Sequence, residues 1–340
     1  MRDSAAPRSI LFIGLSATGH GGIQRFNRRV IESLRALGCR PGVAMRADHP
    51  PRRFAATIVA TLRRADVVLI GHINLLPLAL LARALRPRAR IILFAHGIEV
   101  WGDPAYRAPR WWERRVLRAA IDRIAIVSRF SQQRMAAAFG LQAAKFVLFP
   151  NAVDLPEPSP LAPVVAGKTI LAVARLGAGE REKHVDKLVS ALPALPDAQL
   201  TVIGDGPLRG ELQDLAATLG VSNRVALPGW VDEAALARAY AEAQVFALPS
   251  SKEGFGIVYL EAWARGLPVI GSRFGAAAEV IEEGADGFVV DPEDVPALAD
   301  RLRRLLDDPE LARRMGAAGH RKTASRYSAA AFTHNLAALL

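Results

Sequence analysis

The sequence has very little cysteine and few aromatic residues. Cys39 is the single cysteine among 340 residues, and Phe, Trp and Tyr together make up 6% of the chain. One thiol cannot form a disulfide within the chain, so a disulfide framework is excluded and a reducing compartment is indicated. Apolar residues make up 51%, which is enough to build two buried cores in a chain of this length. We therefore expect a cytoplasmic protein of two ordinary domains.

Long uninterrupted apolar runs are also missing. Residues 67–85 are rich in Leu and Ile, but His72, Asn74 and Pro77 interrupt them. This pattern favours a strand, a turn and a buried helix over a membrane span. Near the N-terminus, the apolar run 10–15 is short for a secretion signal and has the length of a first sheet strand.

Acidic residues are scarce in the first half of the chain. Through residue 165 there are 25 Lys/Arg and 10 Asp/Glu, a net charge of +15, and the remainder has 19 and 23, a net charge of −4. A basic half can attract nucleic acid, anionic lipid or an anionic acceptor, or it can be a solvated arginine-rich surface. There is no zinc-finger spacing and no aromatic ribonucleoprotein signature, so we expect no nucleic-acid partner. A nucleic-acid-binding protein is kept as the alternative of a different class, and it would bind DNA with a steep salt dependence.

The chain instead contains short apolar runs that alternate with helical patterns, which is typical of doubly wound α/β domains. Four prolines between residues 156 and 163 divide the alternation and predict a stiff linker. We predict an N-terminal domain over 1–160, a C-terminal domain over 165–325 and a final helix over 326–340. The predicted strands are Ile10–Ile13, Val43–Met45, Val67–Ile70, Ile91–Phe94, Ile124–Val127, Phe146–Leu148, Ile170–Val173, Leu200–Ile203, Val225–Leu227, Val245–Leu248, Val269–Ile270 and Phe288–Val290.

One stretch, residues 250–261, organises the second half. The apolar run before it predicts a buried strand that ends at Pro249, and a helical pattern follows over 257–264. Glu253 lies in the glycine-rich loop between them, and Glu261 lies one to two turns into the helix. Free backbone N–H groups and the positive end of the helix dipole suit a phosphate or sugar hydroxyls. An ordinary crossover with surface glutamates has the same spacing, so the spacing alone leaves both interpretations open.

The two glutamates, placed around Gly-Phe-Gly, resemble the Glu-x7-Glu signature of retaining glycosyltransferases of family 4. The similarity extends through Gly-Leu-Pro-Val-Ile at 266–270, through 275–281 and through Gly-Phe-Val-Val at 287–290. The resemblance implies the GT-B fold, in which two Rossmann-like doubly wound domains face each other across an inter-domain cleft. It also implies that a nucleotide-sugar donor binds mainly to the second domain. The C-terminal helix would cross back to the first domain, where Phe332 and Leu336 would pack.

The same resemblance assigns two cations to the donor diphosphate. Arg175 follows the predicted strand 170–173, at the sheet edge where doubly wound folds bind ligands, and Lys183 follows eight residues later. Family members use an Arg and a Lys here to stabilise the leaving nucleotide, which gains negative charge as the glycosidic bond breaks. The family often has Gly after the Lys, but this chain has His184, so the local turn can differ. A solvated lysine in the charged run 180–183 is the alternative.

For the donor sugar, the resemblance implies that Glu253 holds hydroxyl groups and that Glu261 accepts hydrogen bonds from the ribose. Gly-Asp-Gly-Pro at 204–207 lies beside the nucleotide in similar enzymes, although it also makes a plain turn. Residues 227–231 resemble the segment that contacts the base, largely through its backbone. The donor-binding residues implied in this way are Glu261, Gly21, Gly22, Gly204, Trp230, Val231, Gly254, Phe255, Gly256 and Ile257.

In the first half, Gly-His-Gly-Gly at 19–22 joins the first predicted strand to its helix and resembles the family's loop over the diphosphate and acceptor. It lacks the spacing of a dinucleotide fingerprint, which disfavours a NAD-dependent oxidoreductase. His96 follows the predicted strand 91–94, and the family often has a catalytic His here, near the donor sugar. A single His at a strand end is otherwise more often structural. Glu99 and Asn151 are candidates for contact with the acceptor.

Trp111 and Trp112 lie among five arginines between residues 107 and 118, on a helix predicted over 111–120. Cationic and aromatic residues together suit an interfacial helix that docks on a bilayer. Family members that act on lipid-linked acceptors often attach through this domain. A core-packed Trp pair beside a solvated arginine face is the alternative. The hypothesis is peripheral contact with an anionic membrane at the inner face of the cell membrane.

The residues and the resemblance together predict a retaining hexosyltransferase. It would transfer a hexose from GDP-mannose or a UDP-hexose to a hydroxyl of a glycan or lipid-linked saccharide, in the synthesis of cell-surface polysaccharide or glycolipid. Glycosyltransferases that need a divalent metal usually carry an Asp-x-Asp triplet, and this sequence has none. We therefore predict metal independence, with no metal site and no cofactor. A sugar-nucleotide epimerase of the same fold is the alternative enzyme.

Overall fold

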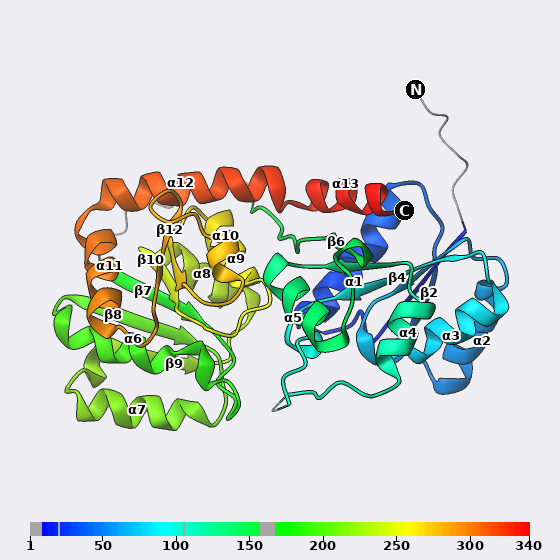
Figure 1. The fold of residues 1–340 in the computed structure, drawn as a ribbon. Helices are drawn as coiled ribbons and strands as arrows, with labels where there is room; N and C mark the ends of the chain where they lie inside the picture. Colours follow the sequence, from blue (N-terminus) through cyan, green and yellow to red (C-terminus); the bar gives the residue numbers. More distant parts are fainter. Residues whose placement is uncertain (1–8, 20, 105, 157–166) are drawn as a thin grey trace. The chain divides into compact units, whose positions relative to one another are not determined.

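The computed structural model describes residues 9–19, 21–104, 106–156 and 167–340. They form two compact units (Figure 1): unit 1 comprises the described residues up to Asn151 together with Ala329–Leu340, and unit 2 comprises those from Ala152 to Ser328. Positions 157–166, which include most of the expected proline linker, lie outside the described residues, as does His20 of the expected glycine loop.

Within its described residues, unit 1 contains one six-stranded sheet whose strands all run parallel, in the order β2-β1-β3-β4-β5-β6. Its strands are β1 (Ile10–Gly14), β2 (Gly42–Met45), β3 (Val67–Ile70), β4 (Arg90–Ala95), β5 (Arg123–Ile126) and β6 (Phe146–Leu148). Its helices are α1 (Gly22–Ala36), α2 (Pro51–Leu62), α3 (Pro77–Leu85), α4 (Glu113–Ala119), α5 (Arg129–Phe139) and α13 (Ala329–Leu339).

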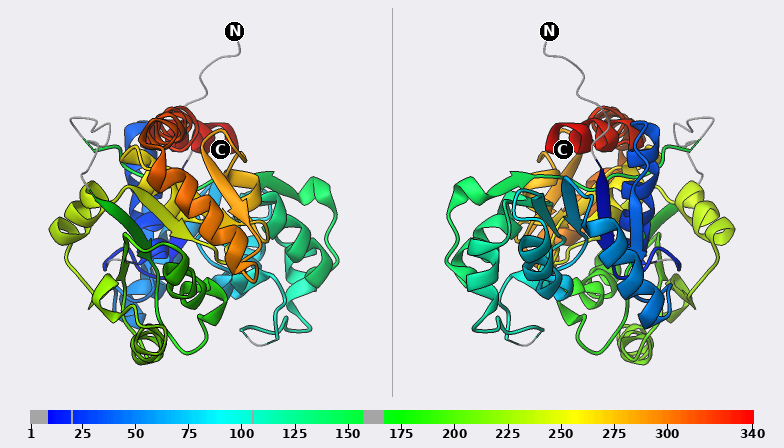
Figure 2. Two further views of the ribbon diagram at one scale, coloured as in Figure 1. Left: turned by 90° about the vertical axis from the view of Figure 1, so that its left-hand side faces the viewer. Right: turned by 90° about the vertical axis from the view of Figure 1, so that its right-hand side faces the viewer.

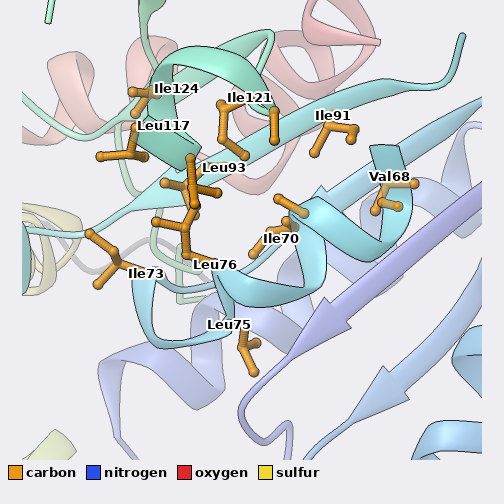
Figure 3. Packing of buried hydrophobic residues seen from close by; sticks show 14 of the residues in the cluster. Val68, Ile70, Ile73, Leu75, Leu76, Ile91, Leu93, Leu117, Ile121 and Ile124 are labelled. Carbon is orange, nitrogen blue, oxygen red and sulfur yellow. The ribbon is translucent and has the colours of Figure 1, made fainter. Parts of the chain in front are cut away.

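One face of this sheet is covered by α2, α3, α4 and α5. Parallel strands are buried on both faces, which is why their sequences are continuous apolar runs, and alternate residues point to opposite faces. Val68, Ile70 and Leu93 of the strands pack against Leu76 and Leu117 of the covering segments (Figure 3). The side chains in this cluster are almost completely buried, so they anchor the helices from which surface residues project.

The opposite face is covered by α1 and α13 through a group of phenylalanine rings. The ring of Phe26 on α1 lies 5.1 Å from that of Phe94 and 5.5 Å from that of Phe332 on α13. Phe149 lies 4.8 Å from Phe332, and both Phe332 and Leu336 are almost fully buried. The last helix of the chain therefore completes the core of unit 1, and it lies along α1 in Figures 1 and 2.

Unit 2 repeats this architecture, with a six-stranded parallel sheet among its described residues in the order β12-β11-β10-β7-β8-β9. Its strands are β7 (Lys168–Val173), β8 (Ala198–Ile203), β9 (Val225–Gly229), β10 (Val245–Leu248), β11 (Val269–Ser272) and β12 (Gly287–Val290). Its helices are α6 (Val185–Ala191), α7 (Leu208–Thr218), α8 (Glu233–Glu242), α9 (Ile257–Ala264), α10 (Ala277–Val280), α11 (Val295–Asp307) and α12 (Pro309–Arg326).

Helix α9 is apolar on almost every side, as expected for a helix enclosed in a core. Its Trp263 is fully buried and donates its indole N–H to the carbonyl oxygen of Asp286 at 2.9 Å. Gly316 and Gly319 of α12 let that helix approach closely, because a Cβ at Gly319 would fall 1.9 Å from the Trp263 ring. Tight packing against α12 therefore fixes α9, and with it the loop that precedes α9.

The predicted alternation is confirmed in both units. All twelve predicted strands are present, with ends that differ by at most two residues, and the helix predicted over Ile257–Ala264 has those bounds. The doubly wound α/β class is therefore confirmed. Strand and helix existence followed from strong apolar periodicity, whereas the ends depended on contacts between neighbouring strands that no local pattern encodes.

The helix predicted to carry both tryptophans is wrong at its start, because α4 begins at Glu113. The Glu113 carboxylate is buried, accepts the backbone N–H of Arg110 at 2.8 Å and pairs with Arg107, which fixes the chain just before the helix. Trp111 is 78% exposed, whereas Trp112 is half-buried against the cluster under α2–α5. The two rings therefore do not form one interfacial pair.

No helix in the described ranges is long and apolar enough to cross a membrane.

Candidate functional site

In both sheets, the first strand has its next neighbours on opposite sides, which makes a topological switch point. In unit 2, β7 lies between β8 and β10, and in unit 1, β1 lies between β2 and β3. Ligands of open parallel sheets bind outside the carboxyl ends of the strands at such points. Arg175 follows β7 and Glu253 follows β10, while Gly21 and Gly22 lie at the start of α1, the helix that follows β1. The fold thus gathers the residues singled out from the sequence at two sheet edges.

The central contact at the edge of unit 2 joins Lys183 to Glu253. The Lys183 Nζ lies 2.6 Å from Glu253 Oε1, and each side chain is 15% exposed. Lys183 ends a short 3-10 helix over Arg181–Lys183, and Glu253 lies in the loop between β10 and α9. Gly275, at φ +74°, lies against the backbone of this loop, where a Cβ would stand 3.2 Å from the Ser251 carbonyl oxygen. Lys183 and Glu253 therefore form an ion pair that is largely shielded from solvent.

Arg175 extends further into solvent than Lys183. Its side chain is 81% exposed, and its guanidinium Nη2 lies 2.6 Å from Glu180 Oε1. Glu180 Oε2 is also 3.9 Å from Lys183 Nζ. Glu180 therefore joins the two cations that the resemblance assigns to the diphosphate, whereas the sequence showed this residue only as part of a charged run.

The turn into α9 depends on Gly256. This residue takes φ +87°, and a Cβ there would fall 2.4 Å from the ring of Tyr259. The Tyr259 hydroxyl is fully buried and donates to the Leu248 carbonyl at 2.6 Å, which ties α9 to the end of β10. Burial, and then the nearby charge of Glu253, raises the pKa of Tyr259 well above its usual value, so the hydroxyl stays a neutral donor. No side chain caps the N-terminus of α9.

The side chain of Phe255 faces inward and anchors this loop. Phe255 is 5% exposed, and its ring lies 5.6 Å from that of Tyr327. Gly254 precedes it, and Ile257 opens the helix with its side chain half-buried. The loop therefore reaches the sheet edge with buried anchors and with backbone N–H groups at an uncapped helix start.

Glu261 is the fifth residue of α9 and is 7% exposed. Its carboxylate accepts a hydrogen bond from the Tyr240 hydroxyl at 3.2 Å. The Arg265 guanidinium lies 4.6 Å from the centre of the Tyr240 ring and donates to the Glu261 carbonyl oxygen at 3.0 Å. Glu261 is therefore a sheltered carboxylate on a rigid helix, as a residue that binds a pair of hydroxyls needs to be.

Gly204 has a reason to be glycine that does not involve a ligand. A Cβ at Gly204 would fall 1.7 Å from the Ala174 carbonyl oxygen, and one at Gly206 would fall 2.3 Å from the Leu176 carbonyl oxygen, with φ near +145° at both. The loop after β8 therefore packs directly on the backbone after β7. The Gly204 N–H also donates to the Gly229 carbonyl at 3.0 Å, which brings the end of β9 alongside. Beyond Gly229, the side chain of Trp230 is 67% exposed, and Val231 is half-buried.

His184 keeps a left-handed turn where the family often has glycine. Its φ is +53° and its ψ is +37°, and it is the one non-glycine residue with positive φ in the described part of the chain. A side chain in this region costs about 1–2 kcal/mol. The turn after Lys183 is therefore one that a glycine would also adopt, although the residue differs.

In unit 1, the loop after β1 is held by Asp48. Its carboxylate accepts hydrogen bonds from the Ser16 hydroxyl at 2.6 Å, the Ala17 N–H at 2.8 Å and the Thr18 hydroxyl at 2.9 Å. Burial favours a raised pKa of Asp48, but these hydrogen bonds outweigh it and hold the pKa below the usual value. Gly21 and Gly22 follow at the exposed start of α1, which has no side-chain cap.

His96 lies at the end of β4 with its ring fixed on several sides. Its Nε2 lies 2.8 Å from the Gly71 carbonyl oxygen, which makes Nε2 the protonated nitrogen. The Phe26 ring meets it edge-on at 4.6 Å. Glu99, at 7% exposure, accepts the backbone N–H groups of His96 at 2.6 Å and Gly97 at 3.1 Å. Glu99 therefore stabilises the turn that carries His96.

His72 is a candidate that sequence reasoning missed. It follows β3, is 5% exposed, and stacks on His96 at 6.2 Å with ring planes 22° apart. Its Nδ1 accepts the Asn74 N–H at 3.1 Å, and burial, despite the charge of Glu99, lowers its pKa to about 4, so it is neutral at pH 7. The sequence showed it as an interruption of an apolar run, although its place after a buried strand matches that of His96.

Asn151, at the end of unit 1, is also buried.

No metal-binding arrangement is found in the part of the chain that the structure describes, where no three His, Cys, Asp or Glu side chains are grouped to hold an ion. The carboxylates of Glu180 and Glu253 instead face the cationic groups of Arg175 and Lys183. These four charged side chains at the edge of unit 2 therefore form ion pairs with one another.

Two family profiles match the chain. Residues 162–322 match the family described as glycosyl transferases group 1, and residues 49–157 match glycosyltransferase family 4. The first match covers the sheet edge that carries Lys183 and Glu253, and the second covers most of the unit 1 sheet.

Curated relatives and solved structures agree with these matches. The GDP-mannose-dependent α-(1-6)-phosphatidylinositol monomannoside mannosyltransferase of Mycolicibacterium smegmatis is 37% identical over 268 residues, 72% of this chain and 68% of that protein. The GDP-mannose-dependent monoacylated α-(1-6)-phosphatidylinositol monomannoside mannosyltransferase of Corynebacterium glutamicum is 33% identical over 74% and 70%. Anabaena HepE in complex with UDP and glucose superposes with a TM-score of 0.77 at 20% identity, covering 98% and 99% of the two chains. The lipopolysaccharide outer core galactosyltransferase WaaB superposes with a TM-score of 0.72 at 18% identity, covering 97% and 98%.

The packing of Gly204 predicts that Gly204→Ala destabilises unit 2 before any ligand is added. We expect a loss of at least ~2 kcal/mol in the free energy of unfolding, because the Cβ meets a backbone carbonyl and the backbone conformation is strained. Gly210→Ala on α7 is the control, since nothing lies within 4 Å of its Cβ, and it should stabilise by about 0.5–1 kcal/mol. Chemical denaturation measures both. Wild-type stability of Gly204→Ala with impaired nucleotide binding would assign this glycine to the ligand instead.

Proposed function

Because the chain belongs to the group 1 glycosyltransferases of family 4 and has their GT-B fold, we propose that it transfers a hexose from a nucleotide diphosphate sugar to an acceptor hydroxyl with retention of configuration. The observation that carries this proposal is the ion pair of Lys183 and Glu253 at the switch point of unit 2. A diphosphate needs a cation, and sugar hydroxyls need a fixed hydrogen-bond acceptor. The Lys183 ammonium group and the Glu253 carboxylate lie together beside the N-terminus of α9, which no side chain caps.

In the proposed donor site, separate side chains bind the diphosphate and the donor sugar. Lys183 and Arg175 bind the diphosphate and stabilise the charge that it gains as the glycosidic bond breaks. In the structure these two cations face Glu253 and Glu180, so the diphosphate replaces carboxylates as their partner. Glu253 is then released to hold donor-sugar hydroxyls, with the backbone amides of the loop beside it.

Glu261 is proposed to accept hydrogen bonds from the ribose hydroxyls. Its carboxylate is sheltered and already oriented by the Tyr240 hydroxyl, so little side-chain freedom is lost on binding. Trp230 and Val231 are proposed to lie at the base, and Gly204 beside the nucleotide. Retention follows if the departing phosphate oxygen takes the acceptor proton on the same face of the sugar, while the bond from the anomeric carbon passes from that phosphate to the acceptor oxygen.

Unit 1 is proposed to bind the acceptor, and the resemblance also assigns some of its residues to the diphosphate and the donor sugar. Gly21 and Gly22 offer the uncapped N-terminus of α1, which suits an anion. His96 is proposed to contact the donor sugar with Nδ1, because its Nε2 proton is engaged by the Gly71 carbonyl. Asn151 is proposed as an acceptor contact, and Glu99 acts through the turn of His96.

The donor and acceptor classes come from the relatives. Two relatives above 30% identity are named as GDP-mannose-dependent enzymes that act on phosphatidylinositol mannosides. We therefore propose GDP-mannose as the first donor to test and a lipid-linked saccharide as the acceptor class. Metal independence is proposed as well, supported by the two cations at the diphosphate site and by the lack of an Asp-x-Asp triplet.

A donor screen in the presence of EDTA tests this function. We expect hydrolysis or transfer with one of GDP-mannose, UDP-glucose, UDP-galactose and ADP-glucose, and an α-linked product from an α-donor in the presence of a lipid-linked saccharide. Activity should survive excess EDTA, because cationic side chains take the place of a metal. Loss on chelation with recovery in Mn²⁺ would contradict metal independence. Conversion of the donor alone into another sugar nucleotide would identify an epimerase instead.

The ribose contact predicts that Glu261→Gln weakens nucleoside diphosphate binding. A lost charge-assisted hydrogen bond corresponds to roughly 1.5–3 kcal/mol, or about 10- to 150-fold in affinity. Isothermal titration calorimetry with GDP and UDP measures it. Glu242→Gln, at an exposed position at the end of α8, is the control and should bind as the wild type does. Equal affinities for the two variants would remove Glu261 from the site.

A membrane surface for the lipid-linked acceptor is proposed on the layer formed by α2, α3 and α4, which cover the same face of the unit 1 sheet (Figure 1). Between residues 49 and 98 the sequence has eight arginines and one acidic residue, Asp66. Arginine pairs at 52–53 and 114–115 are exposed on α2 and α4. The exposed large apolar side chains of this layer and the chain before α4 include Val59, Leu80, Leu81, Leu85 and Trp111. Cationic and apolar groups on one layer fit an anionic bilayer surface.

Vesicle co-sedimentation tests this surface. Each arginine near an anionic bilayer contributes about 1 kcal/mol, so Arg52→Glu/Arg53→Glu should lower the bound fraction on anionic vesicles several-fold, and salt should weaken binding of the wild type. Arg313→Glu/Arg314→Glu makes the same charge change on the exposed side of α12 in unit 2 and should leave the bound fraction unchanged. Equal binding to zwitterionic and anionic vesicles, with no effect of either variant, would show that the arginines are only solvated.

A further inference from the structure

His184 has a strained backbone and a fully engaged side chain, a combination that suggests a role for the imidazole. Its φ of +53° is a conformation that glycine adopts without strain. Residues held in such conformations cluster at functional sites, where the surrounding structure keeps them in place. In the described residues, every other position with positive φ is occupied by glycine. A glycine here would satisfy the backbone, so the side chain must supply something that glycine lacks.

The imidazole joins the turn of Lys183 to the loop of Glu253. His184 Nε2 lies 2.8 Å from the Ser251 hydroxyl oxygen, and the side chain is 14% exposed. The Ser251 N–H donates to the Glu182 carbonyl at 2.9 Å, and Lys252 Nζ lies 3.2 Å from Glu182 Oε1. Segments about 70 residues apart in the sequence are thus fastened side by side, with the Lys183–Glu253 ion pair at the centre.

The bond to Ser251 forms with a neutral imidazole in either tautomer. Either Nε2–H donates to the hydroxyl oxygen, or the hydroxyl donates to Nε2. His184 Nδ1 lies 3.5 Å from Glu293 Oε1, and Lys187 lies on the far side of that carboxylate. Burial lowers the pKa of His184; the charges of Asp186, Glu293 and Glu182 act against this, and that of Lys187 acts with it. The ring is therefore neutral near pH 7 and keeps its bond to Ser251.

This bridge becomes important when the donor binds. In the proposed function, Lys183 turns to the diphosphate and Glu253 to the sugar, so the ion pair that joins the two segments is lost at the moment when their spacing matters. The bond between His184 and Ser251 uses neither of these groups. It can hold the segments in register while both charged groups are engaged by the donor.

We propose that His184 is a positioning residue of the donor site, whose bond to Ser251 fixes the distance between the Lys183 turn and the Glu253 loop in the donor complex. The inference rests on the proposed function, since it needs a donor that takes both charged groups. It also gives a reason for the departure from glycine at this position. The strain of the left-handed turn is retained because the imidazole makes a contact between segments that a glycine cannot make.

The test compares His184→Gly with Ser251→Ala. His184→Gly removes the strain together with the bridge, so its melting temperature should equal or exceed that of the wild type. Both variants should weaken nucleoside diphosphate binding and raise KM for the nucleotide sugar roughly fivefold, the size of one neutral hydrogen bond. The double variant should lose no more than either single one, because the same bond is removed in each case. Calorimetry with the nucleoside diphosphate and steady-state kinetics supply the two readouts.

Ser190→Ala is the matched control, because its hydroxyl bonds to the Asp186 carbonyl within α6 and does not touch the bridge. It should bind and turn over the donor as the wild type does. Wild-type affinity in His184→Gly or Ser251→Ala, or full additivity in the double variant, would overturn the positioning role. If His184→Gly does not fold, Ser251→Ala against Ser190→Ala decides the question. If the wild type binds no nucleotide sugar or nucleoside diphosphate, the proposed function fails, and the positioning role fails with it.

Discussion

Each unit depends on the geometric demand of a parallel sheet. Two parallel neighbours cannot be joined by a tight turn, so each connection crosses back over a face of the sheet, usually as a helix. All the carboxyl ends then lie along one edge, and the loops after them become neighbours however far apart they are in the sequence. In unit 2 this brings Arg175, Lys183 and Glu253 to the sheet edge at the carboxyl ends of β7 and β10. The chemistry of the site follows from this constraint more than from any single residue.

Rigid packing behind the edge gives these loops their shape. The loop before α9 is held by the buried Tyr259 hydroxyl and by the Phe255 ring, and α9 itself is fixed against α12 by close contact at Gly319. Gly204 and Gly256 are needed because backbone or aromatic atoms occupy the space of a Cβ. These two glycines are therefore required by the packing of the fold itself.

The charged residues at the edge of unit 2 form a connected set. Glu180 faces both cations and Glu253 pairs with one of them, so two carboxylates balance the two cations. Any anion that bound these cations would therefore have to replace carboxylates as their partner. At the corresponding sheet edge of unit 1, the described residues include two stacked imidazole rings, those of His72 and His96.

The sequence alone determined the alternation of strands and helices, the start of α9 and the positions of Glu253 and Glu261, because apolar periodicity and turn chemistry are local properties. The resemblance to the family added expected roles for Arg175, Lys183 and His96. Only the tertiary structure decided what those residues face. Glu180 joins two cations, Glu99 holds a turn, Trp112 packs inward while Trp111 does not, and His184 keeps a glycine-like turn and reaches Ser251. These contacts join segments tens of residues apart or depend on how a side chain packs, and no local pattern carries that information.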